Sequence, residues 1–272
     1  MPGLRVYLLP VSIFHLFYGL LVFYLVPLPE GIGILPVLVA VVSGIFRTIA
    51  VTIILYNLQR EEVSRVIPVV YTYPIFVAII AVLFMGETLG YLQWLAIIIV
   101  VAGAVMVSVR QSPSGSTIWL GKPLPLLFGS SLLLAMADIT SKYALAYISF
   151  WNMFSLSAFC ISGIFLLVSM RPRILSQLSS MERRNSAIAL LAFSEILAPV
   201  GIALLFWALE RGPVSLVSTI ASSRPVFVVI FALILGRILP EFTEWQTGKG
   251  MLTLRLVAIA MIVGGITIIY LS

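Results

Sequence analysis

Five ionisable side chains lie inside long apolar stretches of this sequence, where an isolated charge is unfavourable. They are His15, Arg47, Asp138, Glu195 and Arg224. A charged group at the centre of a bilayer costs at least about 2.5–3.5 kcal/mol, so such residues usually face a partner or a wet cavity. A carboxylate can carry a proton, an arginine can bind a carboxylate or phosphate, and an imidazole titrates near neutral pH. These five residues are therefore the first candidates for a functional site.

The spacing of these charges allows several pairings. Asp138 has Lys142 one turn later on the same helical face, which favours an intrahelical ion pair with the lysine reaching towards the interface. Glu195 and Arg224 could pair with each other, or bind a solute or a proton. Arg47 has acidic partners only at Asp138 or Glu195, so it forms a salt bridge with one of them or binds an anionic group. Because Lys142 would hold Asp138 ionised, Glu195 is the better candidate for proton coupling.

Hydroxyl groups lie beside prolines in two of the apolar stretches. Proline in a membrane helix removes a backbone hydrogen bond and frees a carbonyl, which then needs water or a side chain. Tyr71, Tyr73 and Ser222 adjoin Pro74 or Pro225 in this way, and such places commonly line a cavity. The predicted solute-contacting residues are Arg47, Tyr71, Tyr73, Glu195, Trp207, Ser222 and Arg224, and the predicted coupling residues are Glu195 and Asp138.

The composition indicates an integral membrane protein. Apolar residue types make up 61% of the 272 residues and charged ones only 10%, with a mean hydropathy of +1.18. A soluble domain carries about 25% charged residues. The net charge of +6 resides mainly in short loops, so it does not indicate nucleic-acid binding. With one His, one Cys and no phosphate-binding glycine loop, we expect no metal, no cofactor and no enzymatic activity.

Long apolar runs predict an all-α, polytopic helix bundle of about nine transmembrane helices. Each run approaches the roughly 20 residues that a helix needs to cross a bilayer, which is far longer than a barrel strand. The predicted spans are 6–26, 34–57, 64–85, 91–109, 123–147, 149–170, 187–208, 214–236 and 252–271.

An internal repeat relates the two halves of the chain. VSRVIPVVYTYPIFVAIIAV (63–82) aligns without a gap on VSLVSTIASSRPVFVVIFAL (214–233), and LQWLAIIIVVAGAV (92–105) aligns on LRLVAIAMIVGGIT (254–267). We divide the chain into a four-helix repeat, 1–110, and a five-helix repeat, 120–272. Because a five-helix unit crosses the membrane an odd number of times, tandem copies are inverted, as in many secondary transporters. We expect Pro74 and Pro225 to form equivalent kinks on either side of a central cavity.

Two segments carry a resemblance to a known family. They are SRVIPVVYTYPIFVAIIAVLFMGETLGYLQWLAIIIVVAGAVMV (64–107) and SLVSTIASSRPVFVVIFALILGRILPEF (215–242). In both, a Ser-Val entry leads to a mid-helix proline and then to a helix ending in Gly-Glu or Gly-Arg. The chain resembles the EamA-like family of the drug/metabolite transporter superfamily, which typically has ten helices in two inverted repeats of five. We expect the first of those ten helices to be missing from this sequence, either because the sequence begins inside a longer gene or because the protein is a nine-helix variant.

This resemblance implies a secondary transporter, an exporter or exchanger of small organic metabolites, amino acids or drugs that works by alternating access. Two alternatives stay open. One is a membrane scaffold or regulatory subunit without transport of its own. The other is a phosphorylated-sugar antiporter of the same superfamily, which would need several cations in its cavity. The expected partners are a small-molecule solute and the lipid bilayer, and a homodimer stays open.

The distribution of Lys and Arg bears on orientation in the membrane. Twelve of these residues fall at one set of predicted helix ends, and two, Lys142 and Arg211, fall at the other. The positive-inside rule then places the N-terminus in the cytoplasm of a multi-pass cell-membrane protein. The family pattern, with its first helix restored, implies the reverse orientation. We favour the charge distribution, because it is a direct physical cause of orientation.

Overall fold

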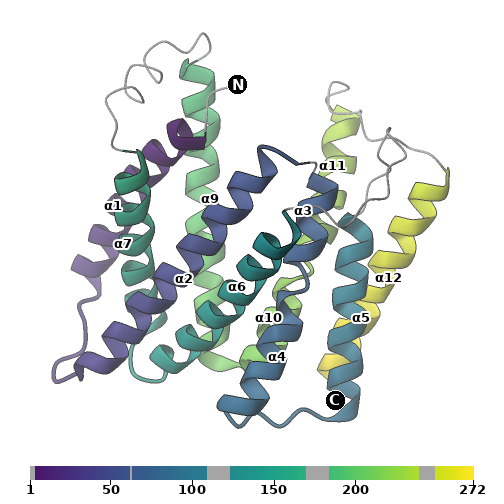
Figure 1. The fold of residues 1–272 in the computed structure, drawn as a ribbon, viewed down its shortest axis with the longest axis horizontal. Helices are drawn as coiled ribbons and strands as arrows, with labels where there is room; N and C mark the ends of the chain where they lie inside the picture. The colour runs from purple at the N-terminus through teal and green to yellow at the C-terminus, as the bar shows by residue number, and fades with distance from the viewer. Residues whose placement is uncertain (1–3, 62, 109–122, 170–183, 239–248) are drawn as a thin grey trace. The chain divides into compact units, whose positions relative to one another are not determined.

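The computed structural model describes residues 4–61, 63–108, 123–169, 184–238 and 249–272, and the regular elements among them are all helices (Figure 1). Their bounds are α1 Leu4–Leu25, α2 Ile34–Leu58, α3 Val63–Val70, α4 Tyr73–Phe84, α5 Tyr91–Ser108, α6 Leu124–Leu145, α7 Phe150–Ser169, α9 Arg184–Arg211, α10 Val214–Ala221, α11 Arg224–Ile238 and α12 Lys249–Leu271. The predicted all-α membrane bundle is confirmed.

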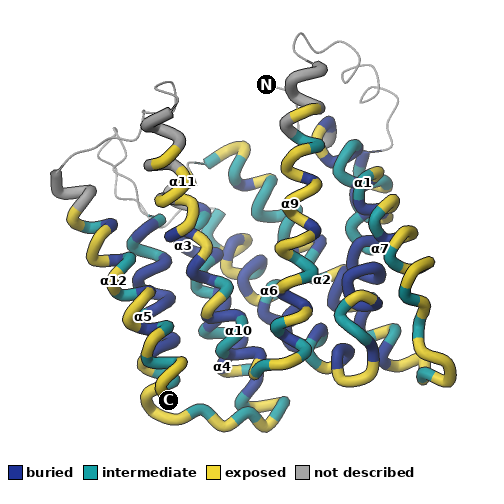
Figure 2. Tube along the Cα trace, turned by 180° about the vertical axis from the view of Figure 1, so that it is seen from behind, coloured by how far each residue is buried: buried dark blue, intermediate teal, exposed yellow. Residues whose placement is uncertain are grey.

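Eight helical segments of the described chain are long and apolar enough to cross a membrane, with α3 and α4 together forming one of them. The ninth predicted span, 214–236, is divided between α10 and α11. Many large apolar residues are exposed, and Figure 2 colours long stretches of α9 and α12 as exposed. A membrane helix satisfies its own backbone hydrogen bonds, so these outer faces can be covered by lipid.

Two helices are interrupted at equivalent positions of the repeat. The first break separates α3, ending at Val70, from α4, and the second separates α10, ending at Ala221, from α11. Matching hydrogen bonds span the breaks, from Ile75 N to the Thr72 carbonyl at 3.1 Å and from Val226 N to the Ser223 carbonyl at 2.9 Å.

A buried proline is the second residue of the helix that follows each break, Pro74 in α4 and Pro225 in α11. Proline fits the first turn of a helix because the N–H groups there have no intrahelical acceptor. The predicted equivalence of the two prolines is confirmed, while the cavity between them stays a prediction.

The described helices form two compact units that differ from the sequence repeats. One contains 1–59 and 136–212, and the other contains 60–135 and 213–272. Each unit therefore combines helices from both repeats, and the continuous helix α6 contributes to both. In the first unit, α7 packs against α1, α2 and α9, and it is buried over much of its length (Figure 2). In the second unit, α5 packs against α12, and α4 against α10.

Two glycines give the α5–α12 contact an internal symmetry. A Cβ on Gly103 of α5 would lie 2.8 Å from the Ala258 carbonyl oxygen and 2.8 Å from Ile262 Cγ1 of α12. A Cβ on Gly265 of α12 would lie 2.5 Å from Val100 Cγ2 of α5. In the repeat alignment Gly103 corresponds to Gly265, and Val100 to Ile262. The two helices therefore exchange equivalent contacts in antiparallel orientation, as an inverted repeat requires.

Glu87, in the loop between α4 and α5, caps the N-terminus of α10. Its carboxylate accepts hydrogen bonds from Val214 N at 2.6 Å, from Ser215 N at 3.3 Å and from the Ser215 hydroxyl. These amides are among the four at a helix N-terminus that have no intrahelical acceptor. A carboxylate there also interacts favourably with the helix dipole.

We expect Glu87→Ala to lower the free energy of unfolding by about 1–2 kcal/mol, the usual contribution of an N-terminal cap. The loss can be measured as a fall in the thermal-unfolding midpoint of the purified protein in detergent. Glu30→Ala is the matched control, because Glu30 is an exposed loop glutamate. Equal midpoints for the two variants would contradict the capping role.

Candidate functional site

The two helix breaks belong to the same compact unit, and a hydrogen bond connects the first break to α10, the helix that precedes the second break. We call residues 71–74 and 222–225 the paired helix breaks. The Tyr73 hydroxyl, at the start of α4, donates to the Ser218 carbonyl of α10 at 3.1 Å. Four of the residues predicted to contact solute lie in the paired helix breaks. They are Tyr71, Tyr73, Ser222 and Arg224.

Hydroxyl groups at the breaks satisfy carbonyls of the preceding turns. Thr72 Oγ1 donates to the Val69 carbonyl at 2.7 Å, and Ser222 Oγ donates to the Thr219 carbonyl at 2.6 Å. Tyr71 is half-buried and packs against the apolar cluster of α5, α11 and α12. The breaks are thus held by local bonds and by packing, although each interrupts the regular series of backbone hydrogen bonds along its helix.

Arg224 is the charged residue of the paired helix breaks. It begins α11, near the middle of the apolar stretch that α10 and α11 form, and it is exposed. No acidic partner lies beside its guanidinium among the described residues. Because a cation at this depth is unfavourable in hydrocarbon, Arg224 requires water or an anionic group.

Arg47 and Asp138 form a buried ion pair in the other compact unit. Arg47 Nη2 donates to Asp138 Oδ1 at 2.8 Å, and the two side chains are 11% and 2% exposed. The guanidinium carbon lies 5.3 Å from the centre of the Phe206 ring. This is the cross-repeat salt bridge that was one of the sequence alternatives, so the charge of Arg47 is neutralised within the protein.

Lys142 differs from its sequence prediction. Its ammonium group donates to the carbonyls of Leu209 at 2.8 Å and Gly212 at 2.9 Å, at the C-terminus of α9. Asp138 instead has Arg47 as its ion-pair partner. The last carbonyls of a helix have no intrahelical donor and carry partial negative charge, so they attract a cation. The interpretation of Asp138 and Lys142 as an intrahelical pair is therefore corrected.

Glu195 also has a partner other than the predicted arginine. Its Oε2 lies 3.3 Å from His15 Nδ1 of α1, and the two side chains are 11% and 7% exposed. Arg224, the expected partner, belongs to the other compact unit. The structure thus brings together two ionisable residues that the sequence analysis considered separately.

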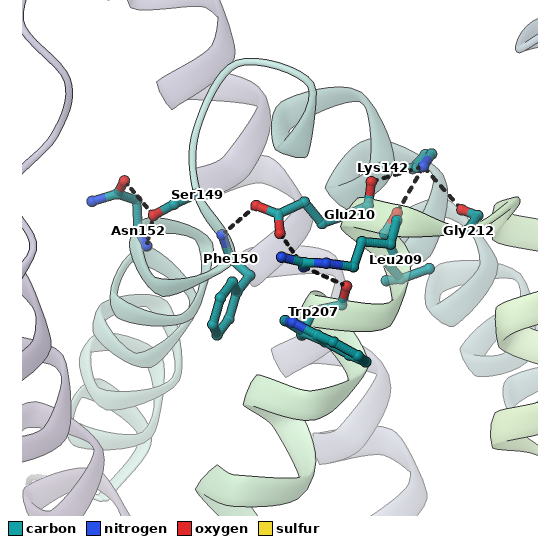
Figure 3. A network of polar contacts seen from close by, with 9 residues as sticks. Lys142, Ser149, Phe150, Asn152, Trp207, Leu209, Glu210 and Gly212 are labelled. Carbon is teal, nitrogen blue, oxygen red and sulfur yellow. Dashed lines mark hydrogen bonds and ion pairs between the residues drawn. The ribbon is translucent and has the colours of Figure 1, made fainter.

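Trp207 lies in a polar network at the ends of helices, away from the middle of a span (Figure 3). The Arg211 guanidinium carbon is 4.7 Å from the centre of its ring. Glu210, which directly precedes Arg211, accepts a hydrogen bond from Phe150 N at the start of α7 at 3.2 Å. Asn152 donates to the Val26 carbonyl at 2.7 Å, just beyond the end of α1.

The sequence analysis missed the roles of Glu87 and Glu210. Both cap the N-terminus of a helix that lies far away in the sequence. Local capping patterns place the acceptor within the same turn, so no short motif indicates a cap of this kind. The only feature of the sequence that could have indicated these roles is that Glu87 and Glu210 each lie close to the end of an apolar run.

The folded chain is a multi-pass helical membrane protein with an internal inverted repeat. Residues 5–109 match the profile of the EamA-like transporter family. Over these residues the chain is similar to a family of membrane transporters of the drug/metabolite superfamily. One solved crystal structure has the same fold, with a TM-score of 0.72 and 18% sequence identity. The structural alignment covers 100% of this chain and 88% of the chain in that crystal structure. No curated protein sequence matches the chain.

Proposed function

We propose that the protein is a secondary transporter of the cell membrane that exports or exchanges small organic solutes by alternating access, with the solute bound at the paired helix breaks. Interrupted helices at equivalent positions of two inverted repeats are typical of solute sites in secondary transporters. The observation that carries the proposal is Arg224, a cation at one of these breaks, near the middle of an apolar stretch and without an acidic partner among the described residues.

The charge balance favours a solute with one negative charge. Of the two mid-span arginines predicted to bind an anion, Arg47 is neutralised by Asp138, and Arg224 has no acidic neighbour among the described residues. A carboxylate matches one guanidinium, whereas a phosphorylated sugar would need additional cations. Amino acids and small organic acids are therefore the favoured solutes, and the phosphorylated-sugar antiporter becomes the weaker alternative.

The remaining predicted contacts divide between the two compact units. Tyr71, Tyr73 and Ser222 share the unit of Arg224, and their hydroxyl groups would orient the polar part of the solute. Arg47, Glu195 and Trp207 belong to the other unit, so their contact with solute stays a prediction.

We expect Arg224→Gln to raise the KM for an anionic solute by about 10- to 100-fold, because a hydrogen bond to a charged group contributes about 1.5–3 kcal/mol. The measurement is counterflow of a labelled mixture of amino acids and small carboxylic acids in proteoliposomes. Metabolite profiling of cells with and without the gene selects the solute for the KM determination.

Arg211→Gln is the matched control, because Arg211 is an exposed arginine beside Glu210 at the end of α9. It should leave the KM close to the wild-type value. An unchanged KM in Arg224→Gln would contradict the assigned site. A membrane scaffold or regulatory subunit would show no counterflow in the wild-type protein.

A further inference from the structure

A histidine and a glutamate meet inside the unit that lacks the paired helix breaks. His15 lies midway along α1 and Glu195 lies on α9, and the two residues are 6% and 8% exposed. His15 Nδ1 is 3.3 Å from Glu195 Oε2. That carboxylate oxygen is buried and has no hydrogen-bond donor among the described residues. A buried carboxylate oxygen without a hydrogen-bond donor is unfavourable when ionised, so this environment favours the protonated form of the Glu195 carboxyl group.

The surroundings of His15 indicate where the proton of the imidazole lies. Nδ1 is 3.0 Å from the Val11 carbonyl, which can only accept a hydrogen bond. Nδ1 therefore carries hydrogen, and the neutral ring has its lone pair on Nε2. An additional proton can then reside either on the Glu195 carboxylate or on His15 Nε2.

The neighbouring elements provide few other charges. α1 and α9 pack against each other and against α7. The other titratable residues on these helices whose side chains the structure describes are Tyr7, Tyr18, Tyr24, Cys160, Glu210 and Arg211. Arg5 and Arg184 belong to the first turns of α1 and α9, at least ten residues from His15 and Glu195 in the sequence. The tyrosines and the cysteine are ordinarily neutral at pH 7. Glu210 and Arg211 lie at the end of α9, about 22 Å along the helix from Glu195. Arg47, which contacts α9 at Phe206, is paired with Asp138.

We infer that His15 and Glu195 form a single proton-binding site, and that binding and release of this proton couple solute movement to the proton gradient. This inference rests on the proposed transport function. With one proton the pair is neutral, either as a carboxylic acid beside a neutral imidazole or as a carboxylate beside an imidazolium. Without it, the pair carries one negative charge.

The two protonation states need different surroundings. A buried pair is most stable when neutral, whereas the negative pair needs water around Glu195 Oε2. The described conformation buries that oxygen and so suits the protonated pair. A proton taken from water on one side while Oε2 is wet, then released to water on the other side, would be carried across the membrane once in each cycle.

The direct test is an infrared pH titration of the purified protein in lipid, with protons as the only ligand. The wild type should show the C=O stretch of a protonated carboxyl group that disappears as the pH rises. Glu195→Gln should lack this signal, and His15→Gln should move its titration midpoint by at least one pH unit. Glu210→Gln, which changes an acid on the same helix, should retain the wild-type signal. A signal that survives in Glu195→Gln, or an unmoved midpoint in His15→Gln, would overturn the inference.

Transport in proteoliposomes separates the failure of this inference from the failure of the proposed function. An imposed pH gradient should drive accumulation of the labelled amino-acid and carboxylic-acid mixture by the wild type. Glu195→Gln should lose this accumulation and keep counterflow exchange. Accumulation by Glu195→Gln at the wild-type level would overturn proton coupling through this pair. A wild type without any exchange would contradict the transport function, and the infrared titration would then decide the proton site.

Discussion

Asp138→Asn is expected to lower the free energy of unfolding by about 3–5 kcal/mol, the usual cost of removing one partner from a buried ion pair. The asparagine keeps the shape of the side chain, but it leaves the buried Arg47 charge without a counter-charge. Asp138 and Arg47 are 2% and 11% exposed, so water can compensate little of the loss. The effect can be measured as the thermal midpoint and the monodisperse yield of the protein in detergent.

A double replacement distinguishes the loss of the pair from damage to the packing. Arg47→Met combined with Asp138→Leu removes both charges and should recover most of the lost stability, since an apolar pair of similar volume often replaces a buried ion pair without cost. Arg211→Gln is the control. It removes the Arg211–Glu210 pair, whose arginine is 53% exposed, and such surface pairs contribute about 1 kcal/mol or less. Equal midpoints for Asp138→Asn and Arg211→Gln would contradict the prediction.

The fold could be predicted from the sequence because its determinants are local. Each span is marked by its own apolar run, and each helix break by a proline at a matched position of the repeat. The predicted alignment places Pro74 on Pro225, and the observed starts of α4 and α11 agree with it. The division into compact units could not be predicted in this way, because it depends on which helices of the two repeats pack together.

The partners of charged side chains were the least predictable part of the candidate site. Spacing along one helix correctly brings Asp138 and Lys142 to one face, yet it cannot reveal the α9 carbonyls beside Lys142 or the guanidinium beside Asp138. The same holds for Glu195, whose neighbour lies on α1. Burial makes each ionisable group find a partner, but the identity of that partner is fixed by tertiary packing.

Gly103→Ala combined with Gly265→Ala is expected to lower the free energy of unfolding by about 2–5 kcal/mol, since each substitution overpacks the α5–α12 contact at a cost of about 1–3 kcal/mol. The new Cβ at Gly103 would meet a backbone oxygen of Ala258 at 2.8 Å, and the one at Gly265 would meet Val100 at 2.5 Å. Backbone atoms cannot move aside singly, so the helices must separate. The thermal midpoints of the two single variants and the double variant in detergent provide the measurement.

Gly264→Ala is the matched control, because Gly264 adjoins Gly265 on α12 and a Cβ there would meet nothing within 4 Å. It should keep or slightly raise the midpoint, since alanine is the better helix former. The symmetry of the α5–α12 contact leads to a second expectation. Gly103 and Gly265 occupy equivalent positions of an inverted repeat, so the two single variants should lose similar amounts of stability. Because either substitution separates the same two helices, the loss in the double variant should be smaller than the sum of the single losses. If only one of the two single variants lost stability, the two glycines would contribute unequally to the free energy of unfolding despite their equivalent backbone positions. A double variant as stable as Gly264→Ala would contradict the close packing of α5 and α12.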